Sequence, residues 1–202
     1  MKTKFLDYST GLIKQYYPET DNIKMEEYKY NLEGLYLTVS KMLIIIPISI
    51  ILKVFKELLI LLIPFNILRE QAHGLHATKS WICLLSSTII FIGVPLLAKN
   101  ITIPFLYKVV LNIIASALIG LYAPADTKKA PIIRKEKRKK LKINSIIYTI
   151  ILIIISLIIN NSTISNLIIF AIWIEVFLIL PLTYKIFHLS YNNYIEYLKN
   201  MN

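Results

Sequence analysis

Four long apolar runs constrain this chain more than any other feature. They cover residues 81–98, 101–123, 144–160 and 166–187, and each is close to the ~20 residues that a helix needs to cross the hydrocarbon of a bilayer. Hydrophobic residues make up 56% of the chain, more than the ~45–50% that is usual in soluble domains. The sequence therefore predicts an all-α, polytopic membrane protein, with residues 1–202 as a single integral membrane domain in the lipid bilayer.

Residues 1–35 are polar and aromatic, unlike the runs that follow. Apolar and aromatic side chains recur at helical spacing as far as Pro18, and Asp21 can cap a second helix. This pattern is typical of amphipathic helices at a membrane surface. We predict cytosolic amphipathic helices here.

Residues 36–68 are apolar apart from a few charged side chains and allow two arrangements. A single long helix would bury those charges in the bilayer at a cost of about 2.5–3.5 kcal/mol each. An apolar hairpin of 36–52 and 57–68 would keep the charged tip in water or headgroups. We favour the hairpin, which gives up to six membrane segments. The charged residues are Lys41, Lys53, Lys56 and Glu57.

The net charge of +11 is concentrated in residues 124–142, which hold nine Lys or Arg against two acidic residues. A basic run can indicate nucleic acid binding. Between two apolar runs, however, the positive-inside rule explains it better, so we expect no nucleic acid partner. A cytosolic loop at 124–142 places the turn at 99–100 outside the cell and residues 69–80 in the cytosol.

The stretch HGLHATKSWIC, residues 73–83, contains the sole cysteine of the chain. A cytosolic thiol stays reduced, and a nucleophilic one needs a base such as His76 beside it. On one straight helix His76 and Cys83 would share a face, but their backbones would be roughly 10 Å apart. A direct hydrogen bond needs about 3 Å. Because Gly74 frees the backbone and either Thr78 or Ser80 can cap a helix, we predict His76 in a catalytic loop, 69–80, and Cys83 on the next helix. If Ser80 is the cap, Cys83 lies at the third helical position.

Plainer interpretations of these residues remain open. Cys83 can be a small apolar side chain in a span, and a histidine at a helix end can be a polar interface residue. A metal site from His73, His76 and Cys83 would have three ligands and no second cysteine or clear carboxylate. We therefore expect no metal and no cofactor.

Two separated segments now carry a resemblance to a known family. REQAHGLHATKSWIC (69–83) and YAPADTKKAPIIRKEKRKKLK (122–142) together resemble the AgrB family of membrane cysteine endopeptidases, and residues 26–33 fit its polar N-terminal region. The resemblance implies that Cys83 is the nucleophile and His76 its base. It implies cleavage of an AgrD-type precursor, whose upstream part is kept as a thioester and closes into a thiolactone or lactone quorum-sensing peptide. It also suggests a homodimer.

Several further residues enter as candidates through these two segments. Arg69 matches the family's arginine and could anchor a carboxylate or simply lie at the membrane edge. His73 stands where family members commonly have glycine, and either Asp126 or Glu70 could orient His76. An acidic precursor tail would be attracted by the basic loop, through Lys128, Lys129, Arg134 and Lys135.

Lys108 and Glu175 are charged residues inside predicted spans. Counted from the outer ends of their spans they lie at similar depths, which predicts an ion pair between them. They also define a rival function, a small membrane peptide exporter or transporter without proteolysis. An inactive accessory scaffold is a third alternative.

Overall fold

The computed structural model describes residues 2–75, 80–128 and 131–200. Within these ranges the regular secondary structure is helical, apart from isolated bridge residues such as His73 and Ala125, which pair with each other. The helices are α1 (Lys2–Tyr16), α2 (Asn22–Ile51), α3 (Phe55–Ala72), α4 (Ser80–Asn100), α5 (Phe105–Tyr122), α6 (Lys135–Ile158), α7 (Ser162–Ile179), α8 (Pro181–Ile186) and α9 (Asn193–Asn200).

The chain divides into two compact units, Met1–Ile48 and Ser49–Asn202. In the first, α1 and the N-terminal part of α2 are joined by an ion pair between Lys2 and Glu33 at 2.6 Å. The rings of Phe5 and Tyr36 stack with centroids 5.4 Å apart. The predicted helices at residues 4–17 and from Asp21 onward correspond to α1 and α2.

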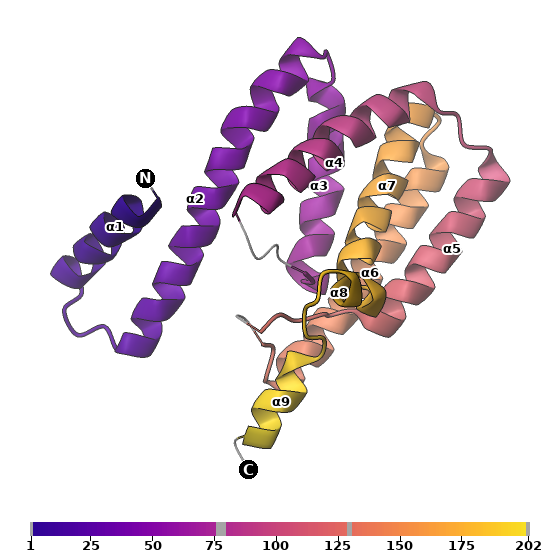
Figure 1. Cartoon of the computed structure of the whole chain (residues 1–202). Coiled ribbons are helices and arrows are strands. Elements are labelled where there is room, and N and C mark those ends of the chain that lie inside the picture. The colour runs from indigo at the N-terminus through magenta and orange to yellow at the C-terminus, as the bar shows by residue number, and fades with distance from the viewer. Residues whose placement is uncertain (1, 76–79, 129–130, 201–202) are drawn as a thin grey trace. The chain divides into compact units, whose positions relative to one another are not determined.

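The second unit is a bundle in which α7 is the central helix (Figure 1). α7 packs against α3, α4, α5, α6 and α8. More than half of α7 is buried, against 22% of the apolar stretch in each of α4, α5 and α6. The outer helices therefore expose apolar side chains, such as Ile113 on α5 and Ile154 on α6, as helices in contact with lipid do.

Five helices among the described residues are long and apolar enough to cross a membrane: Lys24–Ile51, Trp81–Asn100, Phe105–Tyr122, Lys135–Ile158 and Ser162–Ile179. The last four correspond to the four runs that open the sequence analysis. The prediction of an all-α, polytopic membrane protein is confirmed.

The boundaries of α5 and α7 differ from those predicted. α5 starts at Phe105 because Pro104 precedes it in an extended conformation. α7 starts at Ser162, where the side chain of Asn161 accepts a hydrogen bond from the backbone N–H of Ile164 at 3.0 Å. α7 ends at Ile179 instead of continuing to 187, because Pro181 begins the separate short helix α8.

The helix starting at Asn22 breaks after Ile51, and α3 begins at Phe55. Lys53 in the break has φ +56°. Its carbonyl accepts a hydrogen bond from Lys99 Nζ at 3.2 Å, and the same Nζ forms an ion pair with Glu57 at 3.2 Å. The charged residues of the break therefore lie at the same end of the bundle as the C-terminus of α4.

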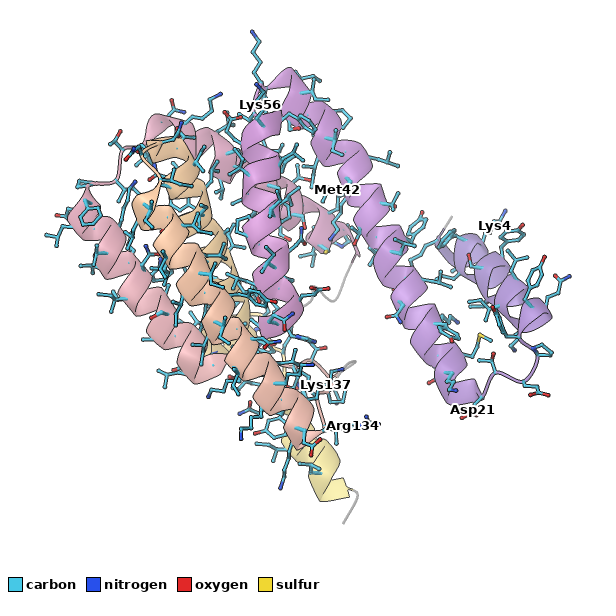
Figure 2. The ribbon with its side chains drawn as sticks, turned by 180° about the vertical axis from the view of Figure 1, so that it is seen from behind. Lys4, Asp21, Met42, Lys56, Arg134 and Lys137 are labelled. Atoms are coloured by element: carbon cyan, nitrogen blue, oxygen red, sulfur yellow. The ribbon has the colours of Figure 1, made fainter. Side chains whose placement is uncertain are left out.

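α6 begins inside the basic segment, nine residues before the predicted span at 144. Lys, Arg and Glu are good helix formers, so the helix extends beyond the apolar part. Figure 2 shows Arg134 and Lys137 at this end of the bundle and Lys56 at the other. The cluster of positive charge is therefore confined to one end of the second unit.

Candidate active site

Arg69, in the last turn of α3, binds the backbone of the segment that follows the helix. Its guanidinium donates to the carbonyl oxygens of His73, of Gly74 at 3.3 Å and of Leu75 at 2.6 Å. Backbone carbonyls away from water need such partners, and the planar fork of arginine presents several donors in fixed directions. Arg69 thereby holds the loop 73–75 that leads to His76.

Gly74 is required in this loop by its conformation and by its surroundings. Its φ is +98°, and an added Cβ would lie 2.7 Å from the carbonyl oxygen of Leu178 and 2.8 Å from Arg69 Nη1. Glycine adopts positive φ without steric cost. The glycine noted in the sequence therefore allows the backbone to approach both Arg69 and α7.

The loop 73–75 is paired with the Pro-Ala-Asp segment 124–126. The backbone N–H of Ala125 donates to the carbonyl of Ala72 at 3.0 Å, and the N–H of Gly74 donates to the carbonyl of Ala125 at 2.9 Å. The N–H of Leu75 donates to the carbonyl of Leu178 on α7 at 2.9 Å. The two segments that carry the family resemblance thus meet in space.

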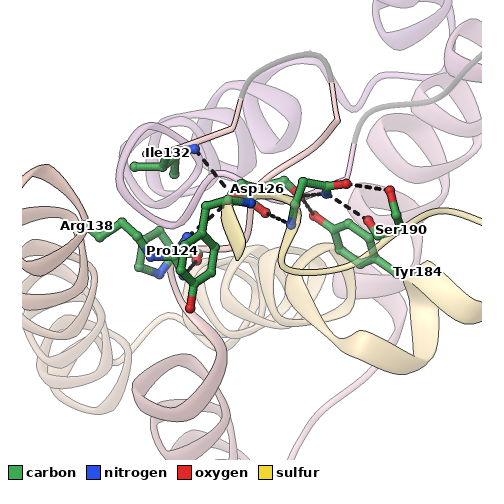
Figure 3. A network of polar contacts seen from close by, with 8 residues as sticks. Pro124, Asp126, Ile132, Arg138, Tyr184 and Ser190 are labelled. Atoms are coloured by element: carbon green, nitrogen blue, oxygen red, sulfur yellow. Dashed lines mark hydrogen bonds and ion pairs between the residues drawn. The ribbon is translucent and has the colours of Figure 1, made fainter. Parts of the chain in front are cut away.

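Asp126 is a buried hub of hydrogen bonds (Figure 3). Its carboxylate accepts from the backbone N–H groups of Asn193 and Tyr194, both at 3.0 Å, and of Ile132 at 3.4 Å. It also forms an ion pair with Arg138 at 3.4 Å. A carboxylate offers about four acceptor sites, so these four donors occupy it.

Asp126 is one of the two acids that the sequence analysis named as able to orient His76. The carbonyl of Asp126 accepts from the hydroxyl of Tyr184 at 3.0 Å, and burial raises the pKa of this phenol, so it remains a donor. The Asp126 carboxylate is occupied as well, and an orienting contact with His76, which lies outside the described residues, stays a prediction. Glu70, the other candidate, is exposed on α3.

Glu175 lies on α7 with its side chain fully buried, and its ion pair is with Arg69 at 3.5 Å. The predicted pair with Lys108 is wrong. Lys108 donates to the hydroxyl of Ser165 at 2.8 Å, and ten residues of helix, or about 15 Å, separate Ser165 from Glu175. The prediction failed because it started the last span at residue 166 and so placed Glu175 too near the outer end.

Cys83 lies in the first turn of α4, half-buried, one position further along than a cap at Ser80 would give. The hydroxyl of Ser86 donates to its carbonyl at 3.3 Å. His76 lies outside the described residues, so its predicted contact with Cys83 stays a prediction. Lys129 also lies outside them.

The remaining candidates lie around the same end of the bundle. Lys128, Arg134 and Lys135 have exposed side chains. His73 has φ +59° at the end of α3, and its buried Nδ1 has no hydrogen-bond partner among the residues that the structure describes. Burial lowers the pKa of His73 below its usual value, and the positive charges of Arg69 and Lys137 act in the same direction. The described residues contain no group of three or more His, Cys, Asp or Glu side chains that could hold a metal ion.

Sequence reasoning missed Arg138, Tyr184 and Asn193 as partners of Asp126. They lie 12, 58 and 67 residues from it in the chain. Arg, Tyr and Asn are common on protein surfaces, so the residue types alone did not indicate these contacts. The only available signal was Asp126 itself, an acid next to a basic segment. Glu175 was noticed as a charge in a span, but its partner was not.

These features together define a class: a helical membrane protein in which a buried Arg–Glu pair and a hub aspartate organise the loop before a helix-borne cysteine. Comparisons with known proteins specify the class further. The family model of accessory gene regulator B matches residues 8–179, which is most of the chain. The chain therefore belongs to the AgrB family.

Individual relatives agree with this assignment. The chain is 32% identical over 177 residues to a putative AgrB-like protein of Clostridium acetobutylicum, covering 88% of this chain and 85% of that protein. It is 38% identical over 142 residues to the accessory gene regulator protein B of Staphylococcus aureus strain Newman, covering 70% and 74%. For a putative AgrB-like protein of Listeria innocua the identity is 36% over 171 residues, covering 84% and 83%. No solved structure matches the chain.

Proposed function

We propose that this AgrB-family protein is a membrane cysteine endopeptidase that cleaves an AgrD-type precursor and starts its cyclisation. One observation carries the proposal. The loop 73–75 is bound by Arg69, Ala125 and Leu178 directly before His76, and the helix that carries Cys83 begins at Ser80. Hydrogen bonds thus fix the chain directly before the segment that contains the predicted base, and a helix begins directly after it.

The chemistry proceeds by covalent catalysis. The sulfur of Cys83 attacks the carbonyl carbon of the scissile peptide bond, and His76 accepts the thiol proton and passes it to the leaving amine. The upstream part of the precursor remains as a thioester on Cys83. A thiol or hydroxyl of the precursor then attacks that thioester and gives its proton to His76. The ring closes, and the Cys83 sulfur leaves and recovers a proton from His76. Because the thioester conserves the acyl energy, ring closure needs no nucleotide.

The partners follow from charge and from the bilayer. We place the active site on the cytosolic face of the cell membrane, because the basic residues at the start of α6 lie at the same end of the bundle as the loop 73–75. Lys128, Lys129, Arg134 and Lys135 would attract an acidic tail of the precursor. The protein would act as a homodimer, as the family resemblance suggests.

Co-expression with a gene that encodes an AgrD-type precursor tests the proposal. Cleavage of the precursor should be lost in Cys83→Ala and in His76→Ala, and a labelled fragment should remain bound to Cys83 through a thioester in the active protein. Ser87→Ala is the matched control, since Ser87 lies one turn further along α4 and has no role in the chemistry. Cleavage that persists in the Cys83→Ala strain rejects the peptidase.

The same experiment addresses a peptide exporter without proteolysis. Such a protein would need Lys108 and Glu175 on one polar path, yet about 15 Å of α7 separates Glu175 from the Ser165 that binds Lys108. An exporter would release uncleaved precursor from wild-type cells. Uncleaved precursor outside wild-type cells, with no cleaved product, would favour the exporter.

A further inference from the structure

The C-terminal segment of this chain contacts the site although it lies beyond the part that matches the family model, which ends at Ile179. The relevant residues are Ser190–Tyr194, between α8 and the first turn of α9. We propose that this segment is a positioning strap, which acts through Asp126 to hold the active-site loop. The proposal rests on the proposed function, because its effect is on the geometry of cleavage.

The strap is anchored by the N-terminus of α9. The first N–H groups of a helix have no partner within it, and here those of Asn193 and Tyr194 donate to the two carboxylate oxygens of Asp126, each at 3.0 Å. A negative charge is favourable at this end of the helix dipole. The side chain of Asn193 closes the turn by donating to the carbonyl of Ser190 at 2.9 Å. Asp126 is thus a helix cap supplied from 67 residues earlier in the chain.

Aromatic contacts also hold the strap against the region around Asp126. The guanidinium of Arg138 lies over the ring of Tyr194, 3.6 Å from its centroid. Arg138 also contacts the Asp126 carboxylate and the carbonyl of Pro124, both at 3.4 Å. The ring of Tyr191 packs edge-on against Tyr184, with centroids 5.1 Å apart, and Tyr184 in turn donates to the Asp126 carbonyl.

A single residue, the neighbour of Asp126 in the chain, connects the strap to the catalytic loop. Ala125, adjacent to Asp126, donates to the carbonyl of Ala72 and accepts from the N–H of Gly74. These two bonds bracket His73 and fix the loop 73–75, the last described residues before His76. A displacement of the base by about 1 Å is enough to lower a rate by roughly a hundredfold. The strap is therefore expected to affect kcat and to leave precursor affinity unchanged.

The first test compares two truncations in membranes. A chain that ends at Leu189 loses the strap, whereas a chain that ends at Asn200 keeps it and serves as the control. With the AgrD-type precursor as substrate, we expect kcat to fall at least about tenfold for the first chain, with KM within about twofold. A rise in KM alone would mean that the tail binds substrate, and an unchanged kcat would overturn the strap.

A double-mutant comparison tests whether the strap acts through Asp126. Asp126→Asn removes the charge that caps α9 and should itself lower kcat. Truncation at Leu189 should then cost much less in the Asp126→Asn background than in the wild type, since residues that act as a unit are not additive. Equal costs in both backgrounds would contradict the proposed route.

Point variants keep the proposal testable if the truncated chain does not accumulate in membranes. Tyr194→Ala removes the ring beneath Arg138 and should lower kcat, and Tyr194→Phe, which keeps the ring, should restore it. A Tyr194→Ala protein with the kcat of Tyr194→Phe contradicts the strap.

A second readout separates this proposal from the proposed function. The rate at which a neutral haloacetamide labels Cys83 needs no precursor, and its pH profile reports the base beside the thiol. Loss of the strap should change that profile in the same direction as His76→Ala. If wild-type protein does not cleave the precursor, the proposed function fails. A profile unaffected by truncation, with cleavage intact, rejects the strap alone.

Discussion

The regions around Glu175 and Asp126 both bury a carboxylate near the loop 73–75, but they compensate its charge in different ways. Asp126 accepts from three backbone N–H groups and pairs with Arg138. Glu175 has the ion pair with Arg69, and within the described ranges neither of its oxygens has a hydrogen-bond partner. Asp126 is thus held by several donors, whereas Glu175 depends on one cation. The loss of one charged partner should therefore reduce folding stability less around Asp126 than around Glu175.

Arg69→Ala is expected to cause the largest loss of folding stability. It leaves Glu175 buried without its cation and removes the donors to three loop carbonyls, at a cost of about 3–5 kcal/mol. Thermal unfolding in detergent would measure the loss. The double variant Arg69→Ala/Glu175→Gln should recover part of it, because no uncompensated charge remains. A loss below about 1 kcal/mol for Arg69→Ala would refute the dependence on one cation.

Gly74→Ala should be the next most damaging change. The new Cβ would lie 2.7 Å from the Leu178 carbonyl oxygen at φ +98°, which we expect to cost about 2–3 kcal/mol and most of the activity. Gly120→Ala is the control, since Gly120 is helical and has open space around it. That change should be stabilising, by up to about 1 kcal/mol. Equal thermal midpoints for the two variants would contradict the close approach.

Arg138→Met probes the region around Asp126. It removes the ion pair and the contact with Tyr194 but leaves three backbone donors on the carboxylate. We expect a loss of about 1–2 kcal/mol, measured in the same unfolding assay. Lys139→Met, at an exposed neighbouring position, should stay within about 0.5 kcal/mol. If Arg138→Met proves as costly as Arg69→Ala, the two regions do not differ as argued.

The smallest expected change in folding stability is the change with pH. Burial lowers the pKa of His73 from 6.5, so the unfolded state binds a proton at higher pH than the folded state does. Stability is then complete above about pH 6.5 and decreases as the pH falls below that value. His73→Asn should flatten the decrease between pH 7 and 5 in thermal unfolding, and asparagine tolerates the positive φ at this position. A slope unchanged by the substitution would assign the acid sensitivity to another group.

Local signals predicted much of the fold. Run length identified α4 to α7, and the spacing of apolar residues identified α1, because both depend on residues that are neighbours in the chain. The errors at the helix boundaries can each be assigned to a particular residue. Pro104, Asn161 and Pro181 mark where α5 and α7 begin or end, and weighting them above hydropathy would have placed Glu175 correctly.

The candidate site, like the fold, could be predicted from the sequence only in part. The sequence by itself determined the membrane fold, the family and the candidates Cys83 and His76, since a motif is a local pattern. Only the tertiary structure decided that Arg69 pairs with Glu175, that Ala125 is bracketed by Ala72 and Gly74, and that Asp126 caps α9. The physical reason is that a buried charge or an orphan N–H must find a partner. Which partner it finds depends on how helices far apart in the chain pack together.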